Sequence, residues 1–186
     1  MSVPAKSTDI IVNGDRIVLR KVTRADAQTI FENVRDREIS RYTFIPHPYR
    51  LRDALHFIRF AQLQMKKGLE YHLGIELKSS ERIIGMIGLM RVDLRNRNAE
   101  IGYWLSKSYW GQGLAGDALH LMLHFAFREL KLVRVYAHVM HPNHASARML
   151  ERAGFTREGC LRKHLLRSGR RLDLLYYGLL KQEYRP

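Results

Sequence analysis

The stretch YWGQGLAGDAL at positions 109–119 holds the residues whose types and spacing most clearly indicate chemistry. Gly111, Gly113 and Gly116 form Gly-x-Gly-x-x-Gly, the spacing of the dinucleotide-binding fingerprint. Small residues leave the backbone nearly bare where an amphipathic helix begins, and the free N–H groups of a helix's first turn attract anions. The stretch therefore indicates a pyrophosphate site. The alternative is that its small residues only allow a strand and a helix to pack closely.

The surroundings of this motif do not fit a nicotinamide cofactor. In a dinucleotide-binding unit the strand runs straight into the first glycine, and an acidic residue about 20 positions on binds the ribose. Here SKSYW separates the preceding strand from Gly111, and the strand after the helix ends in HVMHP without a carboxylate. Residues 112–186 are too few for the rest of a doubly wound domain. We therefore expect a different pyrophosphate ligand.

The elements that must position this motif follow from hydrophobic periodicity. Alternation predicts strands at 16–22, 71–77, 82–92, 99–105 and 133–139, the three middle ones as an antiparallel meander. Helical spacing predicts helices at 51–67, after the glycine motif up to Leu130, and at 143–153. Thr23 and Asp26 form a capping box that opens a further helix, and the chain ends in a long hairpin around Ser168-Gly169. This order predicts a mixed α/β single domain at 14–186 after a tail at 1–13.

Charge and composition separate the classes of partner. Lys and Arg number 32 and Asp and Glu 18, which gives a formal net charge of +14. Such a surface attracts polyanions, such as nucleic acid or phosphorylated cofactors, and repels polyamines. The single cysteine, Cys160, excludes an internal disulfide framework and fits a reducing cytosol. Because the chain has neither a membrane-spanning apolar run nor a secretory signal, we expect a cytoplasmic protein.

Five features in the expected order resemble the GNAT N-acetyltransferases. WGQGLA at 110–115 fits their pyrophosphate loop except at its first position, where Trp110 replaces Arg or Gln. That departure is common in the ribosomal-protein N-terminal acetyltransferase-like branch. The other four features are AEIGYWL at 99–105, Asn143 with Ser146, GF at 154–155 with EG at 158–159, and Asp173 with Tyr177 and Leu179. The resemblance runs from about residue 16 to 184.

The resemblance implies a fold and a coenzyme. The fold is a mostly antiparallel sheet of about seven strands, flanked by about four helices and splayed where acetyl-CoA binds. The Leu105 backbone then lies along the pantetheine arm, Asn143 contacts that arm, and Ser146 lies near the sulfur. The pyrophosphate is held by main-chain groups of Gln112, Gly113, Leu114, Ala115 and Gly116. No metal is implied.

Acetyl transfer from a thioester to an amine needs a proton acceptor and a proton donor, but no nucleophilic side chain. Many members of the superfamily use a helix tyrosine as the acid, and this chain has Leu150 at that position. Ser146 is the replacement candidate, and its alternative role is helix capping. Glu100 is the candidate base, and its alternative role is pairing with an arginine. Tyr177 is a third candidate, although packing in the core also explains a tyrosine there.

Two other groups of residues could serve a metal site or a docking surface. His138, His141 and His144 suggest a metal, but their segment crosses from a strand through a proline into a helix, so the three rings need not converge. LRKHLLRSGRRL at 161–172 is a basic hairpin, either a solvated face or a surface that docks on RNA or the ribosome. The exposed strand edges of such a fold allow two copies to pair as a homodimer.

These observations favour an acetyl-CoA-dependent enzyme that acetylates a primary amine by direct attack on the thioester. The favoured acceptor is the N-terminal α-amine of a protein, such as a ribosomal protein. One alternative is a small amine, although polycationic acceptors fit poorly with a charge of +14. Another is a non-catalytic basic module that binds RNA or the ribosome and keeps an acyl-CoA site.

Overall fold

The computed structural model describes residues 10–167 and 169–185. Within them the strands are β1 (Ile11–Asn13), β2 (Ile17–Lys21), β3 (Tyr71–Leu77), β4 (Arg82–Asp93), β5 (Asn98–Leu105), β6 (Arg134–Met140), β7 (Thr156–Arg167) and β8 (Arg170–Leu180). The helices are α1 (Ala27–Val34), α2 (Arg37–Arg41), α3 (Leu51–Lys67), α4 (Leu114–His124) and α5 (His144–Arg152). None of the described helices is long and apolar enough to cross a membrane.

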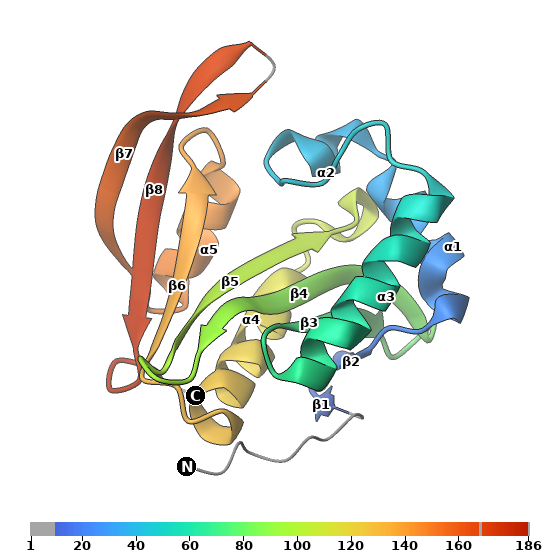
Figure 1. The fold of residues 1–186 in the computed structure, drawn as a ribbon, viewed down its shortest axis with the longest axis horizontal. Helices are drawn as coiled ribbons and strands as arrows, with labels where there is room; N and C mark the ends of the chain where they lie inside the picture. Colours follow the sequence, from blue (N-terminus) through green and yellow to red (C-terminus); the bar gives the residue numbers. More distant parts are fainter. Residues whose placement is uncertain (1–9, 168, 186) are drawn as a thin grey trace.

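The strands form one mixed sheet in the order β1-β2-β3-β4-β5-β6-β8-β7. The neighbours pair antiparallel except β5 and β6, which are parallel. The meander β3 to β5 and the β7–β8 hairpin confirm the expected topology, although Ser168 lies outside the described residues. The long hairpin rises beyond the rest of the sheet next to α2 (Figure 1).

The helices cover both faces of the sheet (Figure 1). On one face α1 and α3 bury a stripe of small and apolar side chains, including Ile30, Ala54 and Ile58, against β4. On the other face the apolar stripe of α4 enters the main core together with Ala147 and Leu150 of α5. Burying these stripes removes apolar surface from water, which is the main stabilising contribution to such a fold.

The expected start at Thr23 and the expected end at Gly68 are observed, whereas the helix predicted up to Leu130 is α-helical only to His124 and continues as a π-helix over Phe125–Glu129. The Asp26 carboxylate accepts from the Thr23 backbone N–H at 2.7 Å, as the capping box predicts, and a short turn leads into α1. Gly68 ends α3 with a φ of 70°, a left-handed conformation that a side chain would strain.

Over residues 10–167 and 169–185 the sheet has eight strands where the family resemblance implies about seven, and five α-helices flank it where about four are expected. The two short elements, β1 and α2, carry no periodic signal because they span only three and five residues. β1 lies inside the segment that we treat as a tail, and it joins the sheet edge by pairing with β2. Asp36 starts α2 by accepting from the Glu38 N–H at 2.9 Å.

Candidate active site

The sheet is split between β5 and β6. These strands pair only from Asn98 to Glu100 on β5 and from Arg134 to Tyr136 on β6. Beyond these pairs β5 continues along β4 alone and β6 along β8 alone. We call the resulting opening, between residues 101–105 of β5 and 137–140 of β6, the gap. Backbone groups on its two edges have no strand partner, so an extended ligand can take their hydrogen bonds.

Leu105 lies where β5 ends at the gap. Its carbonyl accepts a hydrogen bond from the Trp110 indole N–H at 2.7 Å. The tryptophan that departs from the usual pyrophosphate-loop pattern therefore ties the loop to the end of β5. One lone pair of the Leu105 carbonyl is used in this way, and a carbonyl oxygen has a second one.

The glycine motif forms the entry to α4. Gly111 and Gly113 have φ values of 75° and 80°, and Gly113 is the residue that caps the helix. The Arg16 guanidinium donates to the Gln112 carbonyl at 2.9 Å and pairs with Asp117 at 2.8 Å, which fixes the loop on the helix. Leu114 turns its side chain into the core, so it presents only main-chain groups to this entry.

Close packing does not account for Gly116. A Cβ built there meets no atom within 4 Å, and neither does one at Gly111. Packing against a strand therefore does not require glycine at position 116. Open space lies beside the first-turn N–H groups, which have no acceptor within the helix. This arrangement fits an anion such as a diphosphate.

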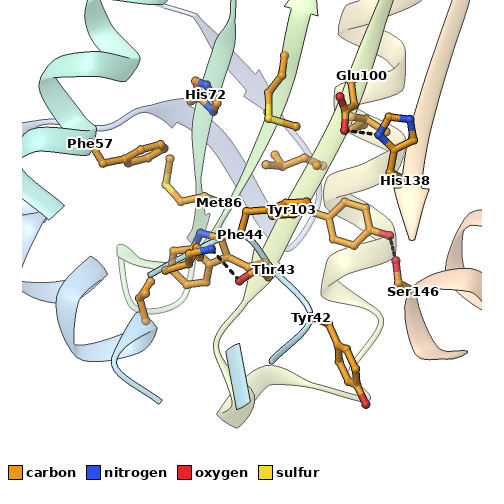
Figure 2. A pocket seen from close by; sticks show the side chains of 18 of the residues that line it. Tyr42, Thr43, Phe44, Phe57, His72, Met86, Glu100, Tyr103, His138 and Ser146 are labelled. Carbon is orange, nitrogen blue, oxygen red and sulfur yellow. Dashed lines mark hydrogen bonds and ion pairs between the residues drawn. The ribbon is translucent and has the colours of Figure 1, made fainter. Parts of the chain in front are cut away.

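Glu100 lies at the last paired position of β5 and is 8% exposed. Its Oε2 accepts from Arg91 Nη1 at 2.5 Å, and its Oε1 lies 2.9 Å from His138 Nδ1 (Figure 2). The expected pairing with an arginine is present, and the carboxylate also lines a large pocket. His138 Nε2 is buried and has no hydrogen-bond partner among the described residues.

His138 is a site residue that sequence reasoning considered only as a metal ligand. It lies two positions after Tyr136, the residue of β6 that pairs with Glu100, and so shares a sheet face with Glu100. A parallel register between β5 and β6 would have revealed this neighbour. Within the part of the chain that the structure describes, no three His, Cys, Asp or Glu side chains are arranged to hold a metal ion.

Ser146 and Tyr103 form a pair across the gap, with their oxygens 2.7 Å apart (Figure 2). Asn143 Oδ1 accepts from the Ser146 backbone N–H at 3.2 Å, so Asn143 caps α5 and leaves the Ser146 hydroxyl free of that role. Burial raises the pKa of Tyr103 to about 12, while the hydrogen bond with Ser146 opposes this rise. Tyr103 was missed from sequence, although it stands in the AEIGYWL segment.

Tyr177 is a core residue. It is 2% exposed, packs in the main core and donates to Glu151 Oε1 at 2.9 Å. Leu150, which replaces the helix tyrosine, is fully buried in the same core. Tyr103 and Ser146 therefore place hydroxyl groups beside the gap, whereas Tyr177 and Leu150 do not line it.

A pocket of about 600 Å³ extends from the gap to the face under α3, and we call it the large pocket. Glu100, Tyr103, His138, Asn143 and Ser146 line it where the strands separate. Residues of α1, α3 and the segment 42–49 enclose the rest, as Figure 2 shows for Phe57 and Phe44. The two candidate proton-transfer groups thus open onto one cavity.

The basic hairpin borders this cavity. Arg167, at the end of β7, donates to the carbonyl of Ser40 at 2.8 Å and also to that of Thr43. Its guanidinium carbon lies 5.9 Å from the ring centre of Phe44, which lines the large pocket. The hairpin therefore holds the segment that forms one rim of the pocket.

Comparisons with known proteins agree with this geometry. The family model described as Acetyltransferase (GNAT) domain matches residues 16–156. The Uncharacterized N-acetyltransferase YoaA of Bacillus subtilis (strain 168) is 34% identical over 173 residues, which cover 92% of this chain and 97% of that protein. A solved structure described as "Crystal structure of Probable acetyltransferase" has a TM-score of 0.86 and 30% identity, covering 94% of this chain and 99% of that one.

Two further relatives have names that specify an acceptor. The Ribosomal-protein-serine acetyltransferase of Escherichia coli (strain K12) is 36% identical over 83 residues, 45% of this chain and 46% of that protein. The Spermidine N(1)-acetyltransferase of Vibrio cholerae serotype O1 (strain ATCC 39315 / El Tor Inaba N16961) is 25% identical over 169 residues, 91% of this chain and 95% of that protein. The two names point to different acceptors.

Proposed function

This chain belongs to the GNAT acetyltransferase family and is an acetyl-CoA-dependent N-acetyltransferase; we propose that its acceptor is the N-terminal α-amine of a protein, such as a ribosomal protein. The observation that carries this proposal is the opening of Glu100 and the Tyr103–Ser146 pair onto one cavity at the split in the sheet. The name of the E. coli relative supports a ribosomal-protein acceptor.

The coenzyme is proposed to bind at the entry to α4 and in the gap. The main-chain N–H groups from Gln112 to Gly116 hold its diphosphate, because they are unpaired within the helix and lie at its positive end. The β5 edge near Leu105 and the Asn143 side chain flank its pantetheine arm. When bound, acetyl-CoA supplies an acetyl group already activated as a thioester.

Glu100 is proposed to hold the ammonium group of the acceptor and to receive its proton through water. Arg91 and His138 each occupy one carboxylate oxygen, so they fix the orientation of the carboxylate toward the cavity. A carboxylate oxygen accepts more than one hydrogen bond, which leaves room for the amine or a water. Orientation of this kind lets proton transfer and attack occur in one geometry.

Ser146 is proposed to protonate the departing thiolate, directly or through water, and its oxygen takes a replacement proton from Tyr103, which regains one from water. Tyr103 donates to the Ser146 oxygen in this arrangement, so that Ser146 can point its own proton at the sulfur. The raised pKa keeps the Tyr103 hydroxyl protonated near neutral pH, which preserves this donor. The pair thus takes the place of the single tyrosine that the sequence lacks at Leu150.

Charge supports a protein rather than a polyamine as the acceptor. The net charge of +14 repels polycations and favours targets that lie on nucleic acid, as ribosomal proteins do. The basic hairpin gives such a target a docking surface. If it docks on RNA, ribosome binding weakens steeply as salt rises, and binding without salt dependence contradicts this part of the proposal.

The test of function is thiol release from acetyl-CoA in the presence of peptides with ribosomal-protein N-termini. Acetylation of the α-amine, located by mass spectrometry, is the expected result. The same peptides with a blocked N-terminus are the control. If spermidine is acetylated and none of the peptides is, the proposed acceptor is contradicted.

A further inference from the structure

Away from Glu100 the large pocket is lined mainly by apolar and aromatic side chains. The wall under α3 includes Phe57 and Phe60, whose rings lie 5.4 and 6.0 Å from that of His72. The imidazole of His72 is hydrogen-bonded to Glu70, because its Nε2 lies 2.7 Å from Glu70 Oε2. Trp104 of β5 contributes a further aromatic surface.

The floor of the pocket combines glycine with methionine. Gly88 and Gly102 pair across β4 and β5, and the terminal methyl of Met90 lies 2.7 Å from the Cβ position of Gly102. Met86 and Met140 also line the cavity. Methionine is flexible and polarizable, so these side chains adapt to apolar groups of different shape.

The described lining of the large pocket holds few carboxylates. Asp53 and Glu100 are the acidic side chains among its described lining residues. Asp53 accepts from the Arg50 backbone N–H at 2.8 Å at the start of α3, and both oxygens of Glu100 have partners. A polyamine, which carries several charges, would find Glu100 at the reacting end and, among the described lining residues beyond it, only Asp53 at the start of α3 amid apolar and aromatic side chains.

We propose that the acceptor is a monoamine that carries a bulky apolar group, with the amine at Glu100 and the apolar group in the large pocket under α3. This inference rests on the proposed function, so the bulky group is the side chain of the acceptor's first residue. The whole large pocket, including its part at the gap, has a volume of about 600 Å³, which lies in the range of pockets that enclose small ligands. Leucine, methionine or phenylalanine at the first position therefore suits the site better than glycine, alanine or serine.

The experiment measures kcat/KM with peptides that are identical except for their first residue. Phenylalanine and leucine peptides are expected to exceed the alanine peptide by about ten- to hundredfold, because the buried side chain leaves water. 2-Phenylethylamine and spermidine extend the comparison to small amines, and the phenyl compound is expected to be the better acceptor.

The variant Phe57→Ala removes part of the apolar wall, and it is expected to lower the phenylalanine-to-alanine ratio by about tenfold. Leu63→Ala is the matched control, because Leu63 is on the same helix, is 48% exposed and lies outside the pocket lining. It is expected to leave the ratio unchanged. A thermal melt of each variant separates loss of selectivity from loss of the folded state.

The outcomes separate this inference from the proposed function. Acetylation of alanine or glycine peptides at least as fast as phenylalanine peptides overturns the inference and leaves the function standing. If 2-phenylethylamine is acetylated but none of the peptides is, the proposed protein acceptor is overturned and the inference about the apolar group is supported. A preference for spermidine, or no turnover with any of these amines, overturns both.

Discussion

The proposed diphosphate site takes its groups from one continuous segment, whereas the large pocket takes its side chains from several separate segments between residues 30 and 146. In the proposed diphosphate site these groups are main-chain N–H groups from Gln112 to Gly116, in a loop that Arg16 holds through the Gln112 carbonyl. The large pocket is lined by residues from Ile30 to Ser146. A site built from main-chain groups is expected to tolerate changes of side chain except at its glycines, whereas substitutions of lining side chains are expected to change the selectivity of the large pocket.

The largest effect is expected for Gly113→Glu in the proposed diphosphate site. It places a negative charge and a side chain at the entry to α4, where φ is 80° and Arg16 Nη2 is 3.1 Å from the Cβ position. We expect coenzyme A affinity to fall by about a hundredfold or more, because an anion site at a helix N-terminus becomes acidic. Isothermal titration with coenzyme A measures this loss.

Gly169→Glu is the matched control, since Gly169 has a φ of 74° at the hairpin turn and its Cβ position is open. Both variants are expected to lose about 1–2 kcal/mol of folding free energy from backbone strain. Only Gly113→Glu is expected to lose coenzyme binding. Equal affinities in the two variants would mean that the glycine motif serves folding alone.

On the acceptor side, Glu100→Gln tests the proton acceptor. The substitution keeps the shape and removes the negative charge, so kcat/KM is expected to fall about a hundredfold while coenzyme affinity is kept. Glu158→Gln is the control, because Glu158 pairs with Arg134 in an ion pair that does not line the large pocket. A Glu100→Gln enzyme with normal kcat/KM would assign the base to another group.

Tyr103→Phe tests the pair across the gap. Loss of the hydrogen bond to Ser146 is expected to lower kcat by about tenfold with little change in KM, because the group acts on the departing thiolate. Since the pKa of Tyr103 is raised to about 12, its hydroxyl stays protonated up to high pH, and the deficit is expected to be constant from pH 6 to 10. Tyr177→Phe removes a core hydroxyl and should affect stability rather than kcat.

The smallest effect is expected for Arg167→Ala at the rim of the pocket. It removes the two hydrogen bonds that tie β7 to the carbonyls of Ser40 and Thr43. The KM for a peptide is expected to rise about threefold with kcat nearly constant, because a partly exposed contact contributes modestly. Arg171→Ala, an exposed position on the same hairpin, should leave the KM as it is. A large fall in kcat would place Arg167 closer to the reaction.

The difference between the two regions also explains what the sequence could predict. The glycine motif and the α4 stripe are local patterns, and the structure confirms the fold that they indicate. The neighbours Arg91 and His138 of Glu100, and the Tyr103–Ser146 pair, depend on strand register and on where β5 and β6 separate. Hydrophobic periodicity predicts neither the strand register nor the point of separation, so these contacts could be found only in the three-dimensional structure.

The central claim is that the coenzyme diphosphate lies at the N-terminus of α4 while the pantetheine arm passes through the gap. A crystal structure with coenzyme A tests it most directly. The predicted result is diphosphate density beside the amides of residues 112–116 and an extended arm between β5 and β6 that ends near Ser146. Density at another site, or a sheet in which β6 pairs with β5 as far as Leu105, would contradict the account.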